Sequence, residues 1–155
     1  MRLTEILKRE CVKIPLQATD KQGAVNELVD LLCEQMGIAN REPLRQAVWE
    51  RELIRTTGIG RGVAIPHGKC EGPDRLIMAV GRPAQAIDFN AIDKRPVDLI
   101  FLLASPHDQT GPHIQALATI SRMLTNSQFR VAVQMARTAA ELYGVIQEHE
   151  SKLAM

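Results

Sequence analysis

Aromatic side chains and an excess of charge of either sign are both missing from this sequence. Phe, Trp and Tyr make up 3% of the 155 residues, and 19 Lys and Arg stand against 18 Asp and Glu. Proteins that bind single-stranded nucleic acids stack bases on aromatic rings along basic grooves. The sequence has neither feature, so we expect no nucleic-acid partner.

Long apolar runs and paired cysteines are absent as well. The longest run, Leu99 to Ala104, falls far short of the about 20 residues that cross a bilayer, and the start MRLTEILKRE has a glutamate where a secretory signal would be apolar. The three cysteines, Cys11, Cys33 and Cys70, form no C-x-x-C pair. We therefore predict a cytoplasmic protein with reduced thiols that is not embedded in a membrane.

Helical and strand-like apolar patterns alternate along the chain. The spacing predicts strands at 12–16, 77–80 and 97–104, and helices at 3–8, 19–36, 41–55, 112–125, 128–136 and from Thr138 onward. Thr19-x-x-Gln22 and Thr138-x-x-Glu141 resemble capping boxes, and Gly37 is placed to end a helix. With no linker or repeat, we predict one α/β domain over residues 1–155, with a mixed, mostly parallel sheet flanked by helices.

The segment GVAIPHGK places His67 at the end of an apolar run. Pro66 stiffens the approach, and Gly68 removes side-chain bulk on the other side of the ring. This arrangement would leave the imidazole open to a large partner. A single histidine is by default structural, so this segment alone leaves both interpretations open.

A glycine-rich segment, Thr57-Gly58-Ile59-Gly60-Arg61-Gly62, precedes that run. Glycines at alternate positions permit left-handed backbone angles and the close approach of N–H groups to a ligand. The segment is neither a P-loop nor a dinucleotide fingerprint. A flexible hairpin-like loop is the alternative.

Arg51 lies on the apolar stripe of the helix before the glycines, together with Leu44, Ala47, Val48 and Ile54. An inward-pointing guanidinium needs a carboxylate, carbonyl groups or a bound anion as a partner. A structural ion pair and a phosphate-binding arginine are both consistent with this position.

His113 is expected in the first turn of the helix at 112–125, with Thr110 or Gly111 as the N-cap and Pro112 at the first helical position. It shares a stripe with Leu117, Ile120 and Leu124, so it should point toward the core or a cleft. The helix dipole there favours a neutral ring and attracts anions. A histidine that only caps the core is the alternative.

Metal binding and serine hydrolysis have little support. No Cys/His set has the spacing of a structural zinc site, and no H-E-x-x-H occurs. Ser105 has no G-x-S-x-G around it. We expect no metal and no cofactor.

Arg51, the run from Thr57 to His67, and His113 before its helical stripe together resemble the type-2 IIA domains of the bacterial phosphotransferase system, the fructose/mannitol class. Within that class the chain most resembles the nitrogen-regulatory IIA proteins. The resemblance implies that His67 accepts a phosphoryl group at Nε2 from an HPr-like phosphocarrier, with His113 and Arg51 beside it. Thr57, Gly58, Gly60 and Gly62 would form the phosphoryl-pocket loop.

The resemblance also implies a phosphohistidine carrier rather than an enzyme that turns over a small molecule. Its phosphorylation state would regulate target proteins, such as sensor kinases or potassium transporters, in signal transduction. One alternative is a mobile IIA component that passes phosphate to a fructose- or mannitol-type IIB in sugar transport. Another is an adaptor that keeps only the fold. An apolar rim that includes Ile59 and Val63 would suit transient docking of a carrier.

Overall fold

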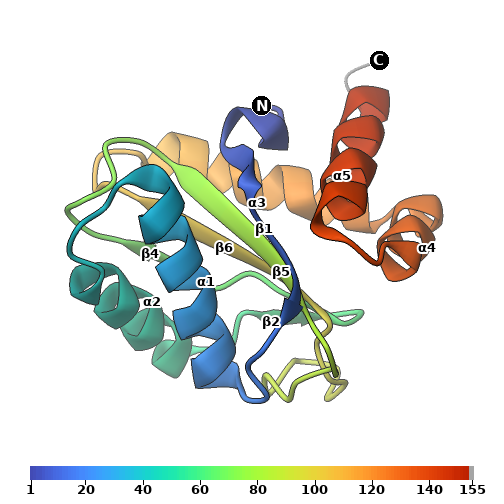
Figure 1. Ribbon diagram of the computed structural model, residues 1–155, viewed down its shortest axis with the longest axis horizontal. Helices are drawn as coiled ribbons and strands as arrows, with labels where there is room; N and C mark the ends of the chain where they lie inside the picture. Colours follow the sequence, from blue (N-terminus) through green and yellow to red (C-terminus); the bar gives the residue numbers. More distant parts are fainter. Residues whose placement is uncertain (154–155) are drawn as a thin grey trace.

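The computed structural model describes residues 1–153, which form one six-stranded sheet with helices around it (Figure 1). The elements follow in the order η1 (Leu3–Glu5), β1 (Leu7–Leu16), α1 (Lys21–Met36), α2 (Glu42–Ile54), β2 (Gly58–Gly60), β3 (Val63–Ala64), β4 (His67–Lys69), β5 (Ile77–Pro83), β6 (Leu99–Ser105), α3 (Thr110–Leu124), α4 (Ser127–Met135) and α5 (Ala139–Leu153).

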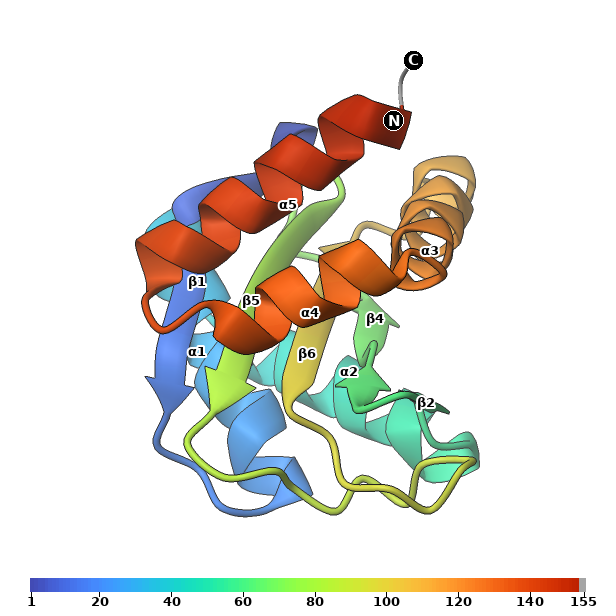
Figure 2. The same cartoon turned by 90° about the vertical axis from the view of Figure 1, so that its right-hand side faces the viewer.

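The sheet is mixed, as the sequence predicts. Its order is β1-β5-β6-β3-β2, and β4 also pairs with β6. β1 with β5, β3 with β6 and β4 with β6 are parallel, whereas β5 with β6 and β2 with β3 are antiparallel. α1 and α2 lie on one face, and α4 and α5 on the other (Figures 1 and 2). α3 lies toward the side of the sheet that holds β6 and β4 (Figure 2).

β6 is the central strand of the core. Every one of its residues from Leu99 to Ser105 is buried. A strand covered by helices on both faces has no solvent-facing side and needs no alternation of apolar and polar residues. The strand predicted at 97–104 is confirmed, with the bounds Leu99–Ser105.

Two predicted boundaries near the N-terminus are wrong. The helix predicted to reach Lys8 is only the short turn of η1, and β1 already begins at Leu7, which lies opposite Met78 of β5. Pairing with a distant strand, not local periodicity, decides this segment. The N-cap of α1 is Asp20 instead of Thr19, since its Oδ1 accepts the Gly23 N–H at 2.9 Å.

Helix ends elsewhere follow the sequence more closely. Gly37 ends α1 with a left-handed φ of 71°, and Thr138 accepts the Glu141 N–H at 3.1 Å in front of α5. α3 begins earlier than predicted, at Thr110 after the N-cap Gln109, so Pro112 is its third residue. His113 nevertheless lies in the first turn, as expected.

β3 and β4 together act as one interrupted strand along β6. Val63 lies opposite Leu99, and His67 lies opposite Leu103. Pro66, between the two short strands, has no N–H to donate, but its carbonyl accepts the Leu103 N–H at 3.0 Å. His67 therefore begins its strand next to the most deeply buried part of the sheet.

Gly68 is the point at which α2 packs on β4. A Cβ built there would lie 2.9 Å from the backbone nitrogen of Val48 and 3.1 Å from the carbonyl carbon of Ala47. Only glycine permits two backbones to approach so closely. The missing side chain makes room for α2. The sequence analysis had instead predicted that it leaves the His67 ring open to a partner.

None of the helices in the described part of the chain is long and apolar enough to cross a membrane.

We predict that Gly68→Ala lowers the free energy of unfolding by about 1 to 3 kcal/mol, because the added methyl group must push α2 away from β4. Urea denaturation measures the loss. The matched control is Gly144→Ala at an exposed position of α5, where a Cβ meets nothing within 4 Å. This change should stabilise the helix by about 0.5–1 kcal/mol. Equal stability of Gly68→Ala and wild type would contradict the packing argument.

Candidate functional site

His67 has one ring nitrogen fixed by the backbone and the other left free. Its Nδ1 lies 2.8 Å from the carbonyl oxygen of Ile65. A carbonyl oxygen can only accept, so Nδ1 carries the proton and Nε2 keeps its lone pair. The ring is half-buried at the start of β4. This tautomer makes Nε2 the nucleophilic atom.

Several groups around His67 act on its protonation. Its pKa is lowered from the ordinary value of 6.5, first by burial and also by the positive charges of Arg51 and Lys69. The hydrogen bond to Ile65 and the Glu52 carboxylate act in the opposite direction. Since a lowered pKa favours the neutral ring, the imidazole keeps a free lone pair at neutral pH.

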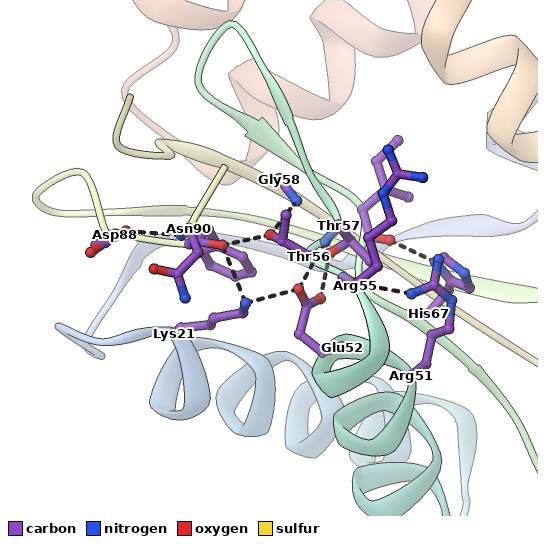
Figure 3. Close-up of polar contacts among 12 residues, drawn as sticks. Lys21, Arg51, Glu52, Arg55, Thr56, Thr57, Gly58, His67, Asp88 and Asn90 are labelled. Atoms are coloured by element: carbon purple, nitrogen blue, oxygen red, sulfur yellow. Dashed lines mark hydrogen bonds and ion pairs between the residues drawn. The ribbon is translucent and has the colours of Figure 1, made fainter. Parts of the chain in front are cut away.

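Arg51 reaches the same place from α2. Its guanidinium donates to the carbonyl oxygen of Arg55 at 3.0 Å (Figure 3). Among residues 1–153 it has no carboxylate at ion-pair distance. Of the two interpretations left open by the sequence, the structural ion pair is thereby excluded within this part of the chain. The guanidinium remains available to an anion.

The predicted apolar stripe of α2 is only partly correct. Leu44 and Val48 are buried, but Ile54 is 81% exposed. Ile54 is the last helical residue, beyond the point at which α2 packs on β4.

His113 lies beside His67, with ring centroids 5.1 Å apart in an edge-to-face arrangement. It is 4% exposed, and its Nδ1 is 3.1 Å from the hydroxyl of Ser105 at the end of β6. Its Nε2 is buried and has no hydrogen-bond partner within the described residues. A buried polar atom without a partner is costly, so Nε2 marks a place where a ligand could bind.

The pKa of His113 is lowered from 6.5 to about 4, mainly by burial and further by His67 and Lys69. The ring is therefore neutral at physiological pH. If the Ser105 hydroxyl donates to Nδ1, then Nε2 carries the proton and can donate it to an oxyanion.

A pocket of about 480 Å³ joins these groups. It is lined by Ala47, Glu50, Arg51, Ile54, His67, Gly68, Lys69 and His113. Side chains from α2, β4 and α3 thus meet in one cavity. The three residues that the sequence singled out, His67, His113 and Arg51, all line it.

Lys69 is a member of this pocket that the sequence analysis missed. Positions 67 and 69 of β4 lie on the same face, because side chains alternate along a strand. The Lys69 Nζ donates to the hydroxyl of Thr110 at 2.8 Å. Its position in the sequence could have revealed it, because a residue two positions after His67 in a short strand points to the same side as His67.

The contacts of Ser105 and Glu52 were missed for a different reason. Both are buried polar residues in otherwise apolar surroundings, Ser105 at the end of β6 and Glu52 in α2. Their partners, His113 and Thr57, lie on other elements or beyond the helix end, so periodicity gives no sign of the contacts.

The glycine-rich loop divides into two parts. Thr57 and Gly58 line a second pocket of about 300 Å³, which His67 and Arg51 also border. Gly60 is the last residue of β2 and Gly62 lies in the turn before β3, with left-handed φ angles of 97° and 78°. They pack near Asp93 and Asp98, and neither lines the two pockets beside His67.

No group of three or more His, Cys, Asp or Glu residues in the described structure could hold a metal ion. Apart from the Glu50 carboxylate, the ionisable groups that line the first pocket are the imidazoles of His67 and His113, the guanidinium of Arg51 and the ammonium of Lys69. Together they offer a nucleophile beside a set of donors for an anion.

The buried, neutral state of His113 predicts a pH-dependent stability. Because its pKa is lower in the folded protein, the unfolded chain binds the proton first. The stabilising contribution is complete above pH 6.5 and is lost as the pH falls toward 4. On lowering the pH to about 5, wild type should lose about 2 kcal/mol more than His113→Gln in urea denaturation.

The exposed His107→Gln is the control for this measurement and should lose as much as wild type. Equal losses in wild type and His113→Gln would contradict the buried neutral ring.

Comparison with known proteins places this chain in a family. Residues 5–149 match the family model described as "Phosphoenolpyruvate-dependent sugar phosphotransferase system, EIIA 2". The chain is 34% identical over 151 residues to a nitrogen regulatory protein of Klebsiella oxytoca, covering 96% of this chain and 91% of that protein.

A second relative is the fructose-specific EIIABC component of Bacillus subtilis, 27% identical over 97% of this chain; the chain spans 24% of that longer protein. The crystal structure of the nitrogen regulatory protein IIA-Ntr from Neisseria meningitidis superposes with a TM-score of 0.84 at 27% identity, covering 92% of this chain and 97% of that one. The chain belongs to the EIIA 2 family of the phosphoenolpyruvate-dependent sugar phosphotransferase system.

Proposed function

We propose that this protein is a nitrogen-branch IIA phosphocarrier, which accepts a phosphoryl group on Nε2 of His67 and regulates target proteins according to its phosphorylation state. The observation that carries the proposal is the position of two neighbouring histidine rings, each with an Nε2 atom available to a ligand. Nε2 of His67 has a free lone pair because Nδ1 is bound to Ile65, and Nε2 of the adjacent His113 is buried without a partner in the described structure.

The transfer step requires no cofactor and no proton acceptor. The lone pair on Nε2 of His67 attacks the phosphorus of a phosphohistidine on an HPr-like carrier. One P–N bond forms as the other breaks. The carrier ring, protonated on its other nitrogen, leaves as a neutral imidazole with the electron pair of the broken bond, and His67 keeps its Nδ1 proton. Such transfer depends chiefly on alignment and charge stabilisation.

The surroundings of His67 suit the product as well as the nucleophile. The attached group brings about −1.5 to −2 charges. Arg51 and Lys69 line the same pocket as His67, and a neutral His113 could donate its Nε2 proton to a phosphoryl oxygen. Thr57 and Gly58 border the ring from the second pocket. We assign no phosphoryl contact to Gly60 and Gly62, which lie at the β2–β3 turn.

Exposed isoleucines provide a surface for the carrier. Ile54 borders the first pocket beside His67, and Ile59 and Ile92 border the second. Val63, which the sequence suggested for this rim, is instead buried against β6. A small apolar patch around a reactive group suits a transient complex.

Similarity to the Klebsiella protein over most of both chains supports regulation as the output. The second candidate is a mobile IIA component of sugar transport, favoured by the similarity to part of the fructose-specific Bacillus protein. Transfer from phosphorylated His67 to a purified fructose-type IIB would support transport. Absence of transfer, together with phosphorylation-dependent binding of a sensor kinase or potassium transporter, would support regulation.

We predict that the protein becomes labelled at His67 when it is mixed with phosphoenolpyruvate, the upstream kinase and its HPr-like carrier. The modification should be labile in acid and absent from His67→Ala. The exposed His107→Ala is the matched control and should be labelled like wild type. An unlabelled wild type beside a phosphorylated carrier, or a labelled His67→Ala, would refute the proposal.

We predict that Arg51→Gln and His113→Gln each slow phosphoryl transfer by about 10²- to 10³-fold, because each removes a group aimed at the developing charge. Quenched-flow measurement with a fixed amount of phosphorylated carrier gives the rate. Arg122→Gln, an exposed change on α3 away from His67, should keep the wild-type rate. Rates within twofold of wild type in both pocket variants would remove their proposed role.

A further inference from the structure

Glu52 is the most deeply buried carboxylate near the site, with 4% of the residue exposed. It follows Arg51 in α2 but points to the other side, toward the loop after the helix (Figure 3). Its Oε2 accepts the backbone N–H of Thr57 at 2.8 Å, and its Oε1 accepts the Thr57 hydroxyl at 2.5 Å. Both carboxylate oxygens therefore hold the same residue.

Lys21 balances the charge of Glu52. Its Nζ lies 2.9 Å from Oε2 of Glu52 and also donates to the carbonyl oxygen of Phe89 at 3.2 Å. The Thr56 hydroxyl donates to that same carbonyl at 2.6 Å. Glu52 thus lies where α1, α2 and the loop around Phe89 meet (Figure 3). Thr57 is bonded directly to Glu52 of α2, and Lys21 and Thr56 tie this contact to the Phe89 carbonyl.

An unbroken series of hydrogen bonds leads from Glu52 to the His67 ring. The carbonyl oxygen of Thr57 accepts the N–H of Ile65 at 3.0 Å. The carbonyl oxygen of Ile65 accepts the Nδ1 proton of His67 at 2.8 Å. Thr57 is the step that links the carboxylate to the backbone of residue 65. Any shift of Thr57 moves the carbonyl group that selects the tautomer of His67.

We infer that Glu52 is a positioning residue, which acts through Thr57 and Ile65 to keep His67 in the Nδ1–H tautomer with Nε2 free. This inference rests on the proposed phosphoryl transfer to His67 and names a residue for it beyond Arg51 and His113. Glu52 does not touch the transferred group. It determines which ring nitrogen is available to attack.

Glu52→Gln is the sharpest test of this role. Three donors converge on the carboxylate: the Thr57 N–H, the Thr57 hydroxyl and the Lys21 ammonium group. A glutamine has the same shape but no charge. Its NH₂ group must take the place of Oε1, where the Thr57 hydroxyl would have to accept instead of donate, and its oxygen would hold the Thr57 N–H and Lys21 without charge assistance. Thr57 should therefore lose its fixed position.

The readout is the ¹⁵N spectrum of the His67 imidazole above its pKa, which separates a protonated ring nitrogen from an unprotonated one. Wild type should show Nδ1 protonated and Nε2 unprotonated. In Glu52→Gln both signals should move toward an average of the two tautomers. Phosphoryl transfer from the carrier should slow by about 10- to 100-fold, because a small misplacement of the attacking atom is enough.

Two further variants make the result decisive. Glu42→Gln removes an exposed carboxylate from the same helix, remote from His67, and should keep the wild-type tautomer and rate. Thr57→Val keeps the shape of the side chain but deletes the hydroxyl bond to Glu52. It should produce the same changes as Glu52→Gln to a smaller degree, and it decides the question if Glu52→Gln does not fold.

A purely structural role for Glu52 predicts a different outcome. Glu52→Gln or Thr57→Val would then unfold at lower temperature, while the folded protein kept the wild-type His67 spectrum and a transfer rate within twofold of wild type. That result would overturn the inference. Failure of the proposed function is distinguishable, because a wild type that takes up no phosphoryl group still has a tautomer that the spectrum reports.

Discussion

The contact between α2 and β4 at Gly68 is the constraint on which the site depends. A helix can approach a strand this closely only where the strand has no side chain. That approach brings Arg51 to one side of His67 and Glu52 to the loop that supports it. Gly68 therefore serves both packing and chemistry. Its missing side chain lets α2 approach β4, and α2 carries the residues Arg51 and Glu52.

In the proposed phosphoryl transfer, the electrostatics of the site would serve two charge states in succession. Before transfer, burial and the cations Arg51 and Lys69 lower the pKa of the His67 imidazole, so its lone pair is free. After transfer, the same cations would face a phosphoryl group of about −2. His113, with a pKa lowered to about 4, can take the role of a neutral donor. A pocket that repels a proton from the ring is thus already arranged to receive an anion.

Membership of the EIIA 2 family accounts for the fold. It does not specify the partner protein, which depends on the residues at the surface. Ile54 ends α2, Ile59 lies in the short β2 and Ile92 lies between β5 and β6. All three are exposed, and substitutions at exposed positions usually cost little stability. A phosphoryl group placed among them would change both the charge and the hydration of the surface that a partner meets. Regulation and transport could therefore use the same buried site with different rims.

Local patterns in the sequence were enough to predict several helices and strands and to indicate the family. Helical spacing and Gly37 marked α1, the continuous apolar run marked β6, and the residues around His67 indicated the family. These features depend on short-range rules, because periodicity and capping involve residues a few positions apart. These rules did not predict the early start of β1, because Leu7 is held in the strand by pairing with Met78 of β5.

The tertiary structure alone decided how the site works. The sequence analysis noticed Gly68, but it could not give the reason for a glycine there. That reason is the close backbone of Val48, which lies on α2. The role of Ile54 was misjudged because α2 leaves the core before its last turn, and Lys69, Ser105 and Glu52 gain meaning only from Thr110, His113 and Thr57. Sequence thus determined which side chains were available for the proposed phosphoryl chemistry. Folding decided which ring nitrogen is free and which charges surround it, because hydrogen bonds and desolvation depend on distances that only the packed chain sets.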